Sequence, residues 1–413
     1  MAAGGLARSL PRRWYERPPA PVLWLLFPLS WLFGTLAGLR RWLYRCGVLR
    51  TQRLPVPVII VGNLTVGGSG KTPLVLWLVE RLRAAGWRPG IISRGYGGSG
   101  EGVRAVAAGA SPALIGDEPL LLARRSGVPV FVGRDRAAAG QALLAAHAEC
   151  DVIVSDDGLQ HYRLQRTAEV VVFDGRGAGN GWLLPAGPLR EPLRRLAGVA
   201  AVVWNGCREA GVVDAAEACP QFEMRLLGQR FVAAGGLAGR PADSCDAASL
   251  RGRKLYALAG IGDPGRFFAQ LQALGLEFEA HPFPDHHPYV AAELAFAGDG
   301  VLLMTEKDAV KCAPIVTGEA WVLPVEAVIS GTPGGGSSAA RRVVPVFSRQ
   351  FWRNSMDARL LDILVCPICK ANLEYRKPQS ELVCKPCKLA FPVRDGIPIM
   401  LQDEARPLSA DEA

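Results

Sequence analysis

The stretch VIIVGNLTVGGSGKTP, from Val58 to Pro73, is the part of this chain that says most about its fold. Its first residues are apolar and β-branched, as in a buried strand, and Pro73 falls where the first turn of a helix tolerates proline. Between them lies a glycine-rich loop whose N–H groups, with the positive end of the helix macrodipole, suit polyphosphate. The stretch therefore predicts a strand, a phosphate loop and a helix that bind a nucleoside triphosphate with its metal.

The loop ends in the cationic and hydroxyl groups that such a site needs. Lys71 can reach the β- and γ-phosphates, and the Thr72 hydroxyl can ligate Mg²⁺. Because the usual pattern has glycine where this chain has Thr65, a glycine-rich turn with a solvated lysine is the alternative. The expected nucleotide-binding residues are Thr65, Val66, Gly67, Gly68, Ser69, Gly70, Lys71 and Thr72.

A second strand ends in carboxylates about eighty residues after the phosphate loop. The apolar run 152–154 leads to Asp156 and Asp157, which suits the acidic site that holds Mg²⁺ in phosphoryl transfer. Adjacent carboxylates repel one another unless a cation lies nearby. An Asp-Asp-Gly turn between strands is the alternative.

Four further segments carry candidate site residues. Arg94 follows a strand, where open α/β sheets bind ligands, although a solvated arginine is equally consistent. Asp117 and Glu118 open a helix, for which ordinary capping is the alternative. Arg190 lies in a proline-rich loop, and the segment 283–288 holds two of only five histidines, which can tune a carboxylate or simply be solvated.

Residues 200–325 are expected to form a second α/β unit, with strands at Val202–Trp204, Lys254–Leu258 and Val301–Met304. Within it, Gly260–Gly265 fits G-x-G-x-x-G, the dinucleotide fingerprint. Asp263 and Pro264 suit a capped helix start better than a pyrophosphate seat, so we discount a dehydrogenase.

Length and composition favour a globular protein of two or three domains with a membrane-facing portion. The chain has 413 residues, 49% hydrophobic and 21% charged, which disfavours disorder. Its net charge of +9 suits nucleic acid, an anionic membrane surface or a phosphorylated substrate, and composition does not choose among them.

The membrane-facing portion is expected at the N-terminus. Residues 20–39 carry no charge and are about as long as a bilayer is thick. Arginines flank both sides, and Pro28 and Gly34 interrupt a straight helix, which disfavours a simple crossing. We expect a helix or helical hairpin in the inner leaflet, with a single span or an uncleaved signal anchor as alternatives.

Four of the ten cysteines form two Cys-x-x-Cys pairs near the C-terminus. They are Cys366, Cys369, Cys384 and Cys387. Two such pairs suit tetrahedral Zn²⁺, and a closed shell of four thiolates is structural. Redox pairs or free thiols are the alternative. Paired spacing without a cleavable signal favours a reducing compartment, the cytoplasm.

Six ordered motifs resemble those of the tetraacyldisaccharide 4'-kinase family, the lipid A 4'-kinases. They are Gly62–Pro73, Ser93–Gly98, Gly116–Pro119, Asp156–His161, Leu184–Glu191 and Thr305–Asp308. The resemblance covers about residues 10–330 and includes the family's loop shape at Thr65. The tail, from Leu360 to about Arg406, resembles the small Trm112-like zinc-ribbon family.

The first resemblance implies transfer of the ATP γ-phosphate to the 4'-hydroxyl of an acylated glucosamine disaccharide 1-phosphate, at the cytoplasmic face of the inner membrane. It implies that Asp117 is the base, tuned by His286, with His287 as the alternative imidazole. The implied catalytic residues are Asp117, His286, Lys71 and Asp157, the magnesium ligands are Thr72, Asp156 and Asp157, and the substrate-binding residues are Arg94, Glu118, Gln160 and Arg190.

The second resemblance implies a protein partner for the tail, because Trm112-like proteins can activate methyltransferases. The rival hypothesis is a P-loop NTPase whose zinc ribbon engages a methyltransferase, a translation factor or nucleic acid. Tyr375 and Phe391 are the only aromatic residues of the tail, which is sparse for a nucleic-acid platform, so no nucleic acid is expected.

The expected fold class is α/β: a P-loop NTPase-type parallel sheet with a second, smaller α/β lobe, an N-terminal membrane-associated helix and a C-terminal zinc ribbon. The expected domains are an N-terminal helical segment at 1–50, the P-loop kinase core at 51–200, the second lobe at 201–330, a flexible linker at 331–349 and the zinc ribbon at 350–413.

Overall fold

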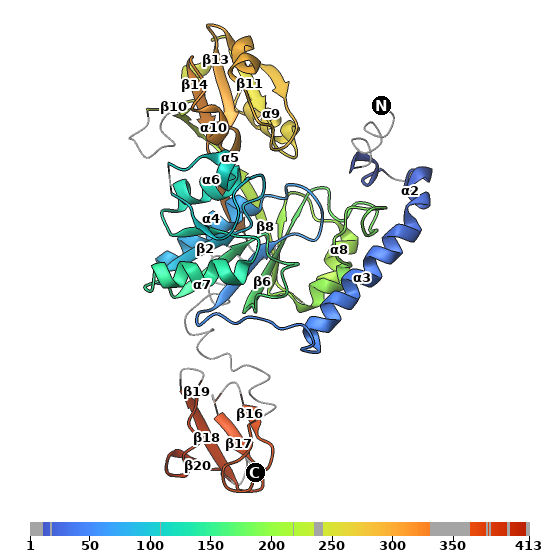
Figure 1. The fold of residues 1–413 in the computed structure, drawn as a ribbon, viewed down its shortest axis with the longest axis vertical. Coiled ribbons are helices and arrows are strands. Elements are labelled where there is room, and N and C mark those ends of the chain that lie inside the picture. Colours follow the sequence, from blue (N-terminus) through green and yellow to red (C-terminus); the bar gives the residue numbers. More distant parts are fainter. Residues whose placement is uncertain are drawn as a thin grey trace. The chain divides into compact units, whose positions relative to one another are not determined.

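The chain divides into two units, residues 1–336 and residues 337–413 (Figure 1). The computed structural model describes residues 11–16, 19–107, 109–217, 219–234, 243–330, 364–376, 379, 381–394 and 397–409. The expected linker at 331–349 lies outside the described residues.

A nine-stranded sheet organises the first unit, in the order β15-β8-β7-β6-β1-β5-β2-β4-β3. Its strands are β1 (Val58–Gly62), β2 (Pro89–Ser93), β3 (Arg104–Ala105), β4 (Val130–Val132), β5 (Val152–Asp156), β6 (Ala168–Asp174), β7 (Ala201–Asn205), β8 (Gln221–Leu227) and β15 (Glu326–Ser330). The seven strands between β15 and β3 are parallel, and the two edge strands are antiparallel. Every residue of β1 is buried, as its uninterrupted apolar sequence predicts.

Helices cover both faces of this sheet, which confirms the α/β class. They are α4 (Lys71–Ala84), α5 (Pro112–Ile115), α6 (Asp117–Ser126), α7 (Arg136–Ala146), α8 (Ala210–Ala215) and the 3₁₀ segment η1 (Leu193–Gly198). Helix α4 begins directly after Gly70, whose φ of 89° is left-handed, and ends before Gly86. The phosphate loop therefore leads straight from β1 into a helix N-terminus.

A six-stranded sheet forms a second lobe of the same unit, in the order β10-β9-β14-β13-β11-β12 (Figure 1, yellow to orange). Its elements are β9 (Arg230–Ala233), β10 (Ser244–Asp246), η3 (Ala248–Leu250), β11 (Leu255–Ala259), α9 (Pro264–Ala273), β12 (Glu279–Pro282), η4 (Ala291–Ala297), β13 (Val301–Thr305), α10 (Glu306–Cys312) and β14 (Ala320–Leu323). The lobe has cores of its own, one of which contains Phe231, Phe267 and Leu303.

The prediction that Val202–Trp204 belongs to the second lobe is wrong. This run lies in β7, buried between β6 and β8 of the first sheet, and β8 and β15 also belong to that sheet. A short apolar run is compatible with a buried strand in either sheet, because its side chains do not specify a partner strand. The second lobe is therefore inserted between β8 and β15.

The N-terminal segment forms a short helix, α2 (Pro21–Leu25), followed by the long helix α3 (Phe27–Arg45). Pro28 lies in the first turn of α3, where proline is tolerated. The expectation that Gly34 interrupts the helix is wrong: a Cβ there would lie 2.6 Å from Cδ1 of Leu183, so this glycine lets α3 approach the core. Among the described residues, no helix combines the length and apolar content needed to cross a bilayer.

The second unit is a small β-structure built around four cysteines. Its elements are β16 (Glu374–Arg376), β17 (Glu381–Cys384), β18 (Leu389–Arg394), β19 (Ile397–Pro398), η5 (Gln402–Glu404) and β20 (Arg406–Pro407). Its small core contains Leu382 and Phe391, together with Cys366 and Cys384. So few apolar side chains stabilise a fold of this size only weakly, which is the usual reason for a metal staple.

Candidate functional site

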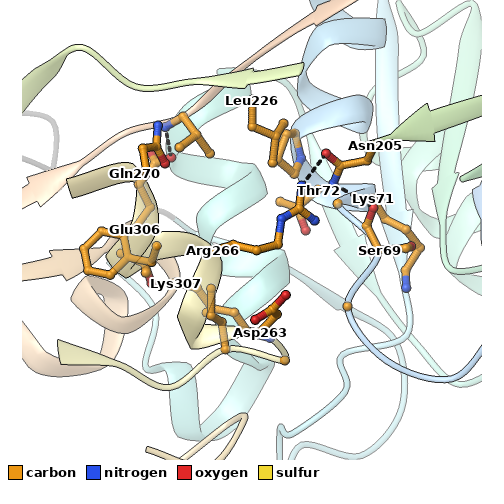
Figure 2. A pocket seen from close by; sticks show the side chains of 18 of the residues that line it. Ser69, Lys71, Thr72, Asn205, Leu226, Asp263, Arg266, Gln270, Glu306 and Lys307 are labelled. Carbon is orange, nitrogen blue, oxygen red and sulfur yellow. Dashed lines mark hydrogen bonds between the residues drawn. The ribbon is translucent and has the colours of Figure 1, made fainter. Parts of the chain in front are cut away.

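The phosphate loop borders a cavity of about 470 Å³ between the two lobes (Figure 2). The loop contributes residues 68–73, and Asp263, Arg266 and Lys307 of the second lobe line the same cavity. The amino group of Lys71 lies 3.2 Å from Oδ1 of Asn63 and 3.6 Å from Oδ1 of Asp157. A cation at a helix N-terminus, facing a cavity, is an arrangement that can accept a polyphosphate.

Asp156 and Asp157 lie beside this loop because β5 is the neighbour of β1 in the parallel sheet. Asp156 is 1% exposed, and its Oδ1 has no hydrogen-bond partner among the residues that the structure describes. Burial and the nearby Glu118 carboxylate raise the pKa of Asp156 to about 7. An oxygen that is buried without a partner next to a second carboxylate fits a divalent cation, so these residues are suited to Mg²⁺.

Asp157 is held differently from its neighbour. Its φ of 48° turns the chain after β5, and its carboxylate lies 3.2 Å from Nη1 of Arg190. Burial opposes ionisation, but the charges of Lys71 and Arg190 outweigh it and lower the pKa of Asp157. The structure thus brings Lys71, Asp157 and Arg190 together, as expected for parts of one site.

Asp117 and His286 face each other across the two lobes. Asp117 is the first residue of α6 and is 5% exposed, and Nδ1 of His286 lies 3.1 Å from each of its carboxylate oxygens. Burial favours the neutral acid, but the hydrogen bond from His286 and nearby lysine charges lower the pKa of Asp117. The same hydrogen bond raises the pKa of His286. The neighbouring His287 instead contacts Glu293, with 2.9 Å between its Nε2 and Oε2 of the carboxylate.

Two lysines of α10 surround this pair with positive charge. Nζ of Lys307 lies 3.0 Å from Glu118 and 3.3 Å from Nε2 of His286. Nζ of Lys311 lies 3.7 Å from Asp117 and 3.5 Å from the fully buried Asp308. Sequence reasoning singled out the segment at 305–308 but missed Lys311, although spacing of four residues places it on the same helix face as Lys307.

Some of the remaining predicted residues line the cavity and others do not. Thr72 and Glu118 line it. Arg94 is exposed just after β2, and Nε2 of Gln160 lies 3.5 Å from Glu191. Neither Arg94 nor Gln160 is among the described residues that line this cavity. Sequence reasoning also missed Asn205 and Arg266, both of which line it.

The four paired cysteines of the second unit come together in a cluster. Their sulfur atoms all lie within 4.8 Å of one another, with 3.8 Å between Cys366 and Cys387 and 3.4 Å between Cys369 and Cys384. A tetrahedron of Zn–S bonds of about 2.3 Å places its sulfurs about 3.8 Å apart. The cluster therefore fits a closed, structural Zn²⁺ site.

The backbone after each cysteine pair has the same unusual turn. Lys370 follows the first pair and Lys388 the second, with φ values of 56° and 52°. Each lysine stands four residues after the first cysteine of its pair. Two equivalent left-handed turns present the two thiol pairs in the same way, which supports a symmetric four-thiolate shell.

Comparisons with known proteins match each of the two units to a protein family. A family model described as tetraacyldisaccharide-1-P 4'-kinase matches residues 22–338, and one described as Trm112p-like protein matches residues 357–396. The chain is 60% identical over 327 residues to a tetraacyldisaccharide 4'-kinase of Dechloromonas aromatica, covering 79% of this chain and 95% of the relative. It is 56% identical over 345 residues to the protein of that name from Azoarcus sp., covering 83% and 96%.

A solved structure gives the same result for the fold. The crystal structure of LpxK from Aquifex aeolicus in complex with ATP is similar with a TM-score of 0.66 and 29% sequence identity. The match covers 80% of this chain and all of the Aquifex chain.

Proposed function

The chain belongs to the tetraacyldisaccharide 4'-kinase family, and on this premise we propose how its residues perform the reaction. It is an ATP-dependent kinase of lipid A biosynthesis that phosphorylates the 4'-hydroxyl of a tetraacyl glucosamine disaccharide 1-phosphate. The observation that carries the assignment of roles is the contact between Asp117 and His286 beside the cavity of Lys71. Glu118 and Asp285, the neighbours of the pair in sequence, line that cavity.

Asp117 is the proposed general base. Its lowered pKa keeps it ionised at neutral pH, so it can accept the proton that the 4'-hydroxyl loses as its oxygen bonds to the γ-phosphorus. The bond from the γ-phosphorus to the β–γ bridging oxygen breaks in the same step, and ADP leaves with those electrons. His286 holds the carboxylate from both oxygens and stabilises the charge until the proton arrives.

Lys71 and the loop N–H groups are proposed to neutralise the phosphate charge. Lys71 now contacts Asn63 and Asp157, two partners that a polyphosphate can replace. Thr72, Asp156 and Asp157 would hold Mg²⁺, which supplies charge neutralisation across the phosphates. The buried Oδ1 of Asp156, for which the described part of the chain offers no hydrogen-bond partner, supports this ligand set.

The acceptor is proposed to approach from the membrane side of the site. Arg190, Arg94, Glu118 and Gln160 are the proposed substrate contacts. A second cavity, of about 480 Å³, lies between α3 and the loop that carries Arg190. Large apolar side chains on α2 and α3 are exposed, among them Trp31 at 70% and Leu25 at 79%. These features support binding to a membrane surface, at the cytoplasmic face of the inner membrane, where ATP is present.

The C-terminal unit is proposed to hold structural Zn²⁺ and to bind a protein partner, with a methyltransferase as the first candidate. The match to Trm112p-like proteins and the four-sulfur cluster support this proposal. Val365, Ile368 and Leu401 are exposed on this unit and give an apolar surface for such a contact.

One experiment tests the function directly. ATP consumption by the full chain is measured with an acylated disaccharide 1-phosphate in mixed micelles, with RNA, and with no acceptor. Consumption that depends on the lipid, with a product phosphorylated at the 4'-position, supports the kinase. Consumption that depends on RNA or on a protein partner would support the rival NTPase hypothesis.

A further inference from the structure

A side chain at the end of a strand of the first sheet holds the backbone of the phosphate loop. Nδ2 of Asn205, at the end of β7, donates to the carbonyl oxygen of Ser69 at 3.0 Å. The asparagine is 1% exposed. Because a peptide unit is planar and trans, a carbonyl held on one side points the following N–H to the other side. The contact therefore directs the N–H of Gly70 away from Asn205.

Arg266 of the second lobe fixes the orientation of the Asn205 side-chain amide. Its Nη2 donates to Oδ1 of Asn205 at 2.8 Å (Figure 2). A guanidinium group only donates hydrogen bonds, so the oxygen of the amide must face Arg266 and the nitrogen must face Ser69. Arg266 lies in α9, so the second lobe sets an orientation within the phosphate loop.

Two glycines allow the close packing that the contacts of Asn205 with Ser69 and Arg266 require. Gly70 has a φ of 89°, and a Cβ there would collide with Nδ2 of Asn205. A Cβ at Gly262 would lie 3.2 Å from the backbone N of Gly68. Gly262 belongs to the G-x-G-x-x-G segment that resembles a dinucleotide fingerprint. In this fold the segment rests against the phosphate loop.

We propose that Asn205 and Arg266 are positioning residues through which docking of the second lobe orients the phosphate loop for ATP. The proposal rests on ATP being the phosphate donor. Without Arg266 the amide of Asn205 is free to turn over, and the carbonyl of Ser69 can swing toward the phosphates, which it repels. ATP affinity then depends on contact between the lobes as well as on the loop itself.

The first variant is Asn205→Asp in the full chain. It keeps the size of the side chain and strengthens the pairing with Arg266, but it replaces the donor to Ser69 by an acceptor. We expect the Kd of a non-hydrolysable ATP analogue, measured by calorimetry, and the KM for ATP to rise about tenfold. We expect kcat at saturating ATP to change less, and amide exchange at Gly70 to become faster.

Arg266→Lys and Arg266→Ala complete the test, with Arg253→Ala as the matched control. Arg253 also belongs to the second lobe but pairs with Glu319 on its surface. We expect weaker binding of the analogue in both Arg266 variants and unchanged binding in the control. The melting temperature without nucleotide shows whether a variant has lost its fold, and Arg266→Lys keeps the charge if the alanine variant does not fold.

Two outcomes would overturn the proposal. In the first, Asn205→Asp and Arg266→Lys both bind the analogue within twofold of the unmodified chain. In the second, the Arg266 variants bind weakly but Asn205→Asp does not, which would mean that Arg266 contacts the nucleotide directly. The analogue titration needs no lipid acceptor, so failure of the proposed acceptor chemistry would not alter this readout.

Discussion

Asp117 is subject to opposing effects that decide its protonation at neutral pH. Burial favours the neutral acid, while His286, Lys307 and Lys311 favour the carboxylate and lower its pKa. Lys311 contributes to this effect through its charge, because its buried ammonium group lies near both Asp117 and Asp308 and has no hydrogen-bond partner among the described residues. The proposed base is therefore an ionised carboxylate in a buried position, and such a group can accept a proton from a sugar hydroxyl.

Asp117→Asn should lower kcat by about 10²- to 10⁴-fold and change the KM for ATP little, because it removes a base and not a nucleotide contact. His286→Ala should lower kcat as well. His287→Ala is the control, since His287 contacts Glu293 and not Asp117. Steady-state kinetics with varied ATP separates the two parameters, and unchanged turnover in Asp117→Asn would rule out its role as base.

The Asp117–His286 pair should also stabilise the fold in a defined pH range. The pKa of Asp117 is lowered, so its contribution is present above about pH 4 and is lost as pH falls. The pKa of His286 is raised, so its contribution is complete below about pH 6.5 and is lost as pH rises through the folded value. The pair is therefore most stabilising between these limits.

His286→Gln, which cannot titrate, should lower the melting temperature more at about pH 5.5 than at about pH 9. The comparison is made by thermal unfolding of the full chain at both pH values. His287→Gln controls for the general effect of pH on the loop that carries both histidines. A deficit that is equal at the two pH values would contradict the assigned shift of His286.

At the scale of elements, α3 combines an exposed apolar surface with a fixed attachment to the core. Oγ of Ser30 donates to the carbonyl oxygen of Leu183 at 2.5 Å, and Gly34 lies against the same residue. Phe27, the first residue of α3, packs edge-on against Trp182, with 5.3 Å between ring centroids. The helix is thus anchored to the loop that leads to Arg190, while Trp31 and Leu36 face solvent.

Trp31→Glu should weaken binding to vesicles that contain anionic lipid by about tenfold or more, because it removes a large apolar group and adds a repelled charge. Binding of an ATP analogue should stay unchanged, since Trp31 is not among the described residues that line the phosphate loop cavity. Val290→Glu is the control, as Val290 is an exposed apolar residue of the second lobe. Vesicle sedimentation measures the effect, and equal loss in both variants would contradict a specific role for α3.

At the scale of the whole molecule, two units with independent cores share one chain. The first contains both lobes of the kinase and every proposed catalytic residue, and the second contains the cysteine cluster. Within the first unit, the proposed catalytic pair of Asp117 and His286 joins one lobe to the other. Kinase activity should therefore depend on the two lobes but not on the C-terminal unit.

Removing residues 350–413 should leave kcat and both Michaelis constants within about twofold of the full chain, since the second unit supplies none of the proposed site residues. The measurement is the lipid kinase assay on both forms at matched concentration. A chain with Cys366→Ser and Cys384→Ser separates loss of the metal from loss of the segment. A collapse of activity on truncation would show that the C-terminal unit is part of the enzyme.

Much of the fold and of the candidate site could be predicted from local patterns in the sequence. The apolar run at 58–61, the glycines after it and Gly-Lys-Thr predict strand, loop and helix, which the structure confirms at β1 and α4. Asp156 and Asp157 fall at the end of β5, beside β1, as parallel pairing of the strands requires. The cysteine spacing predicts the cluster in the second unit, which the structure also confirms.

The phosphate loop, the acidic strand end and the cysteine pairs could be predicted from the amino-acid sequence, because each depends on backbone conformations and spacings that neighbouring residues set. The fold was needed to show that His286 and not His287 faces Asp117, 169 residues away, and that Val202–Trp204 joins the first sheet. It also placed Arg266 on Asn205 and Asn205 on Ser69. Such contacts depend on how the two lobes pack, and packing between distant segments leaves no periodic signal in the chain.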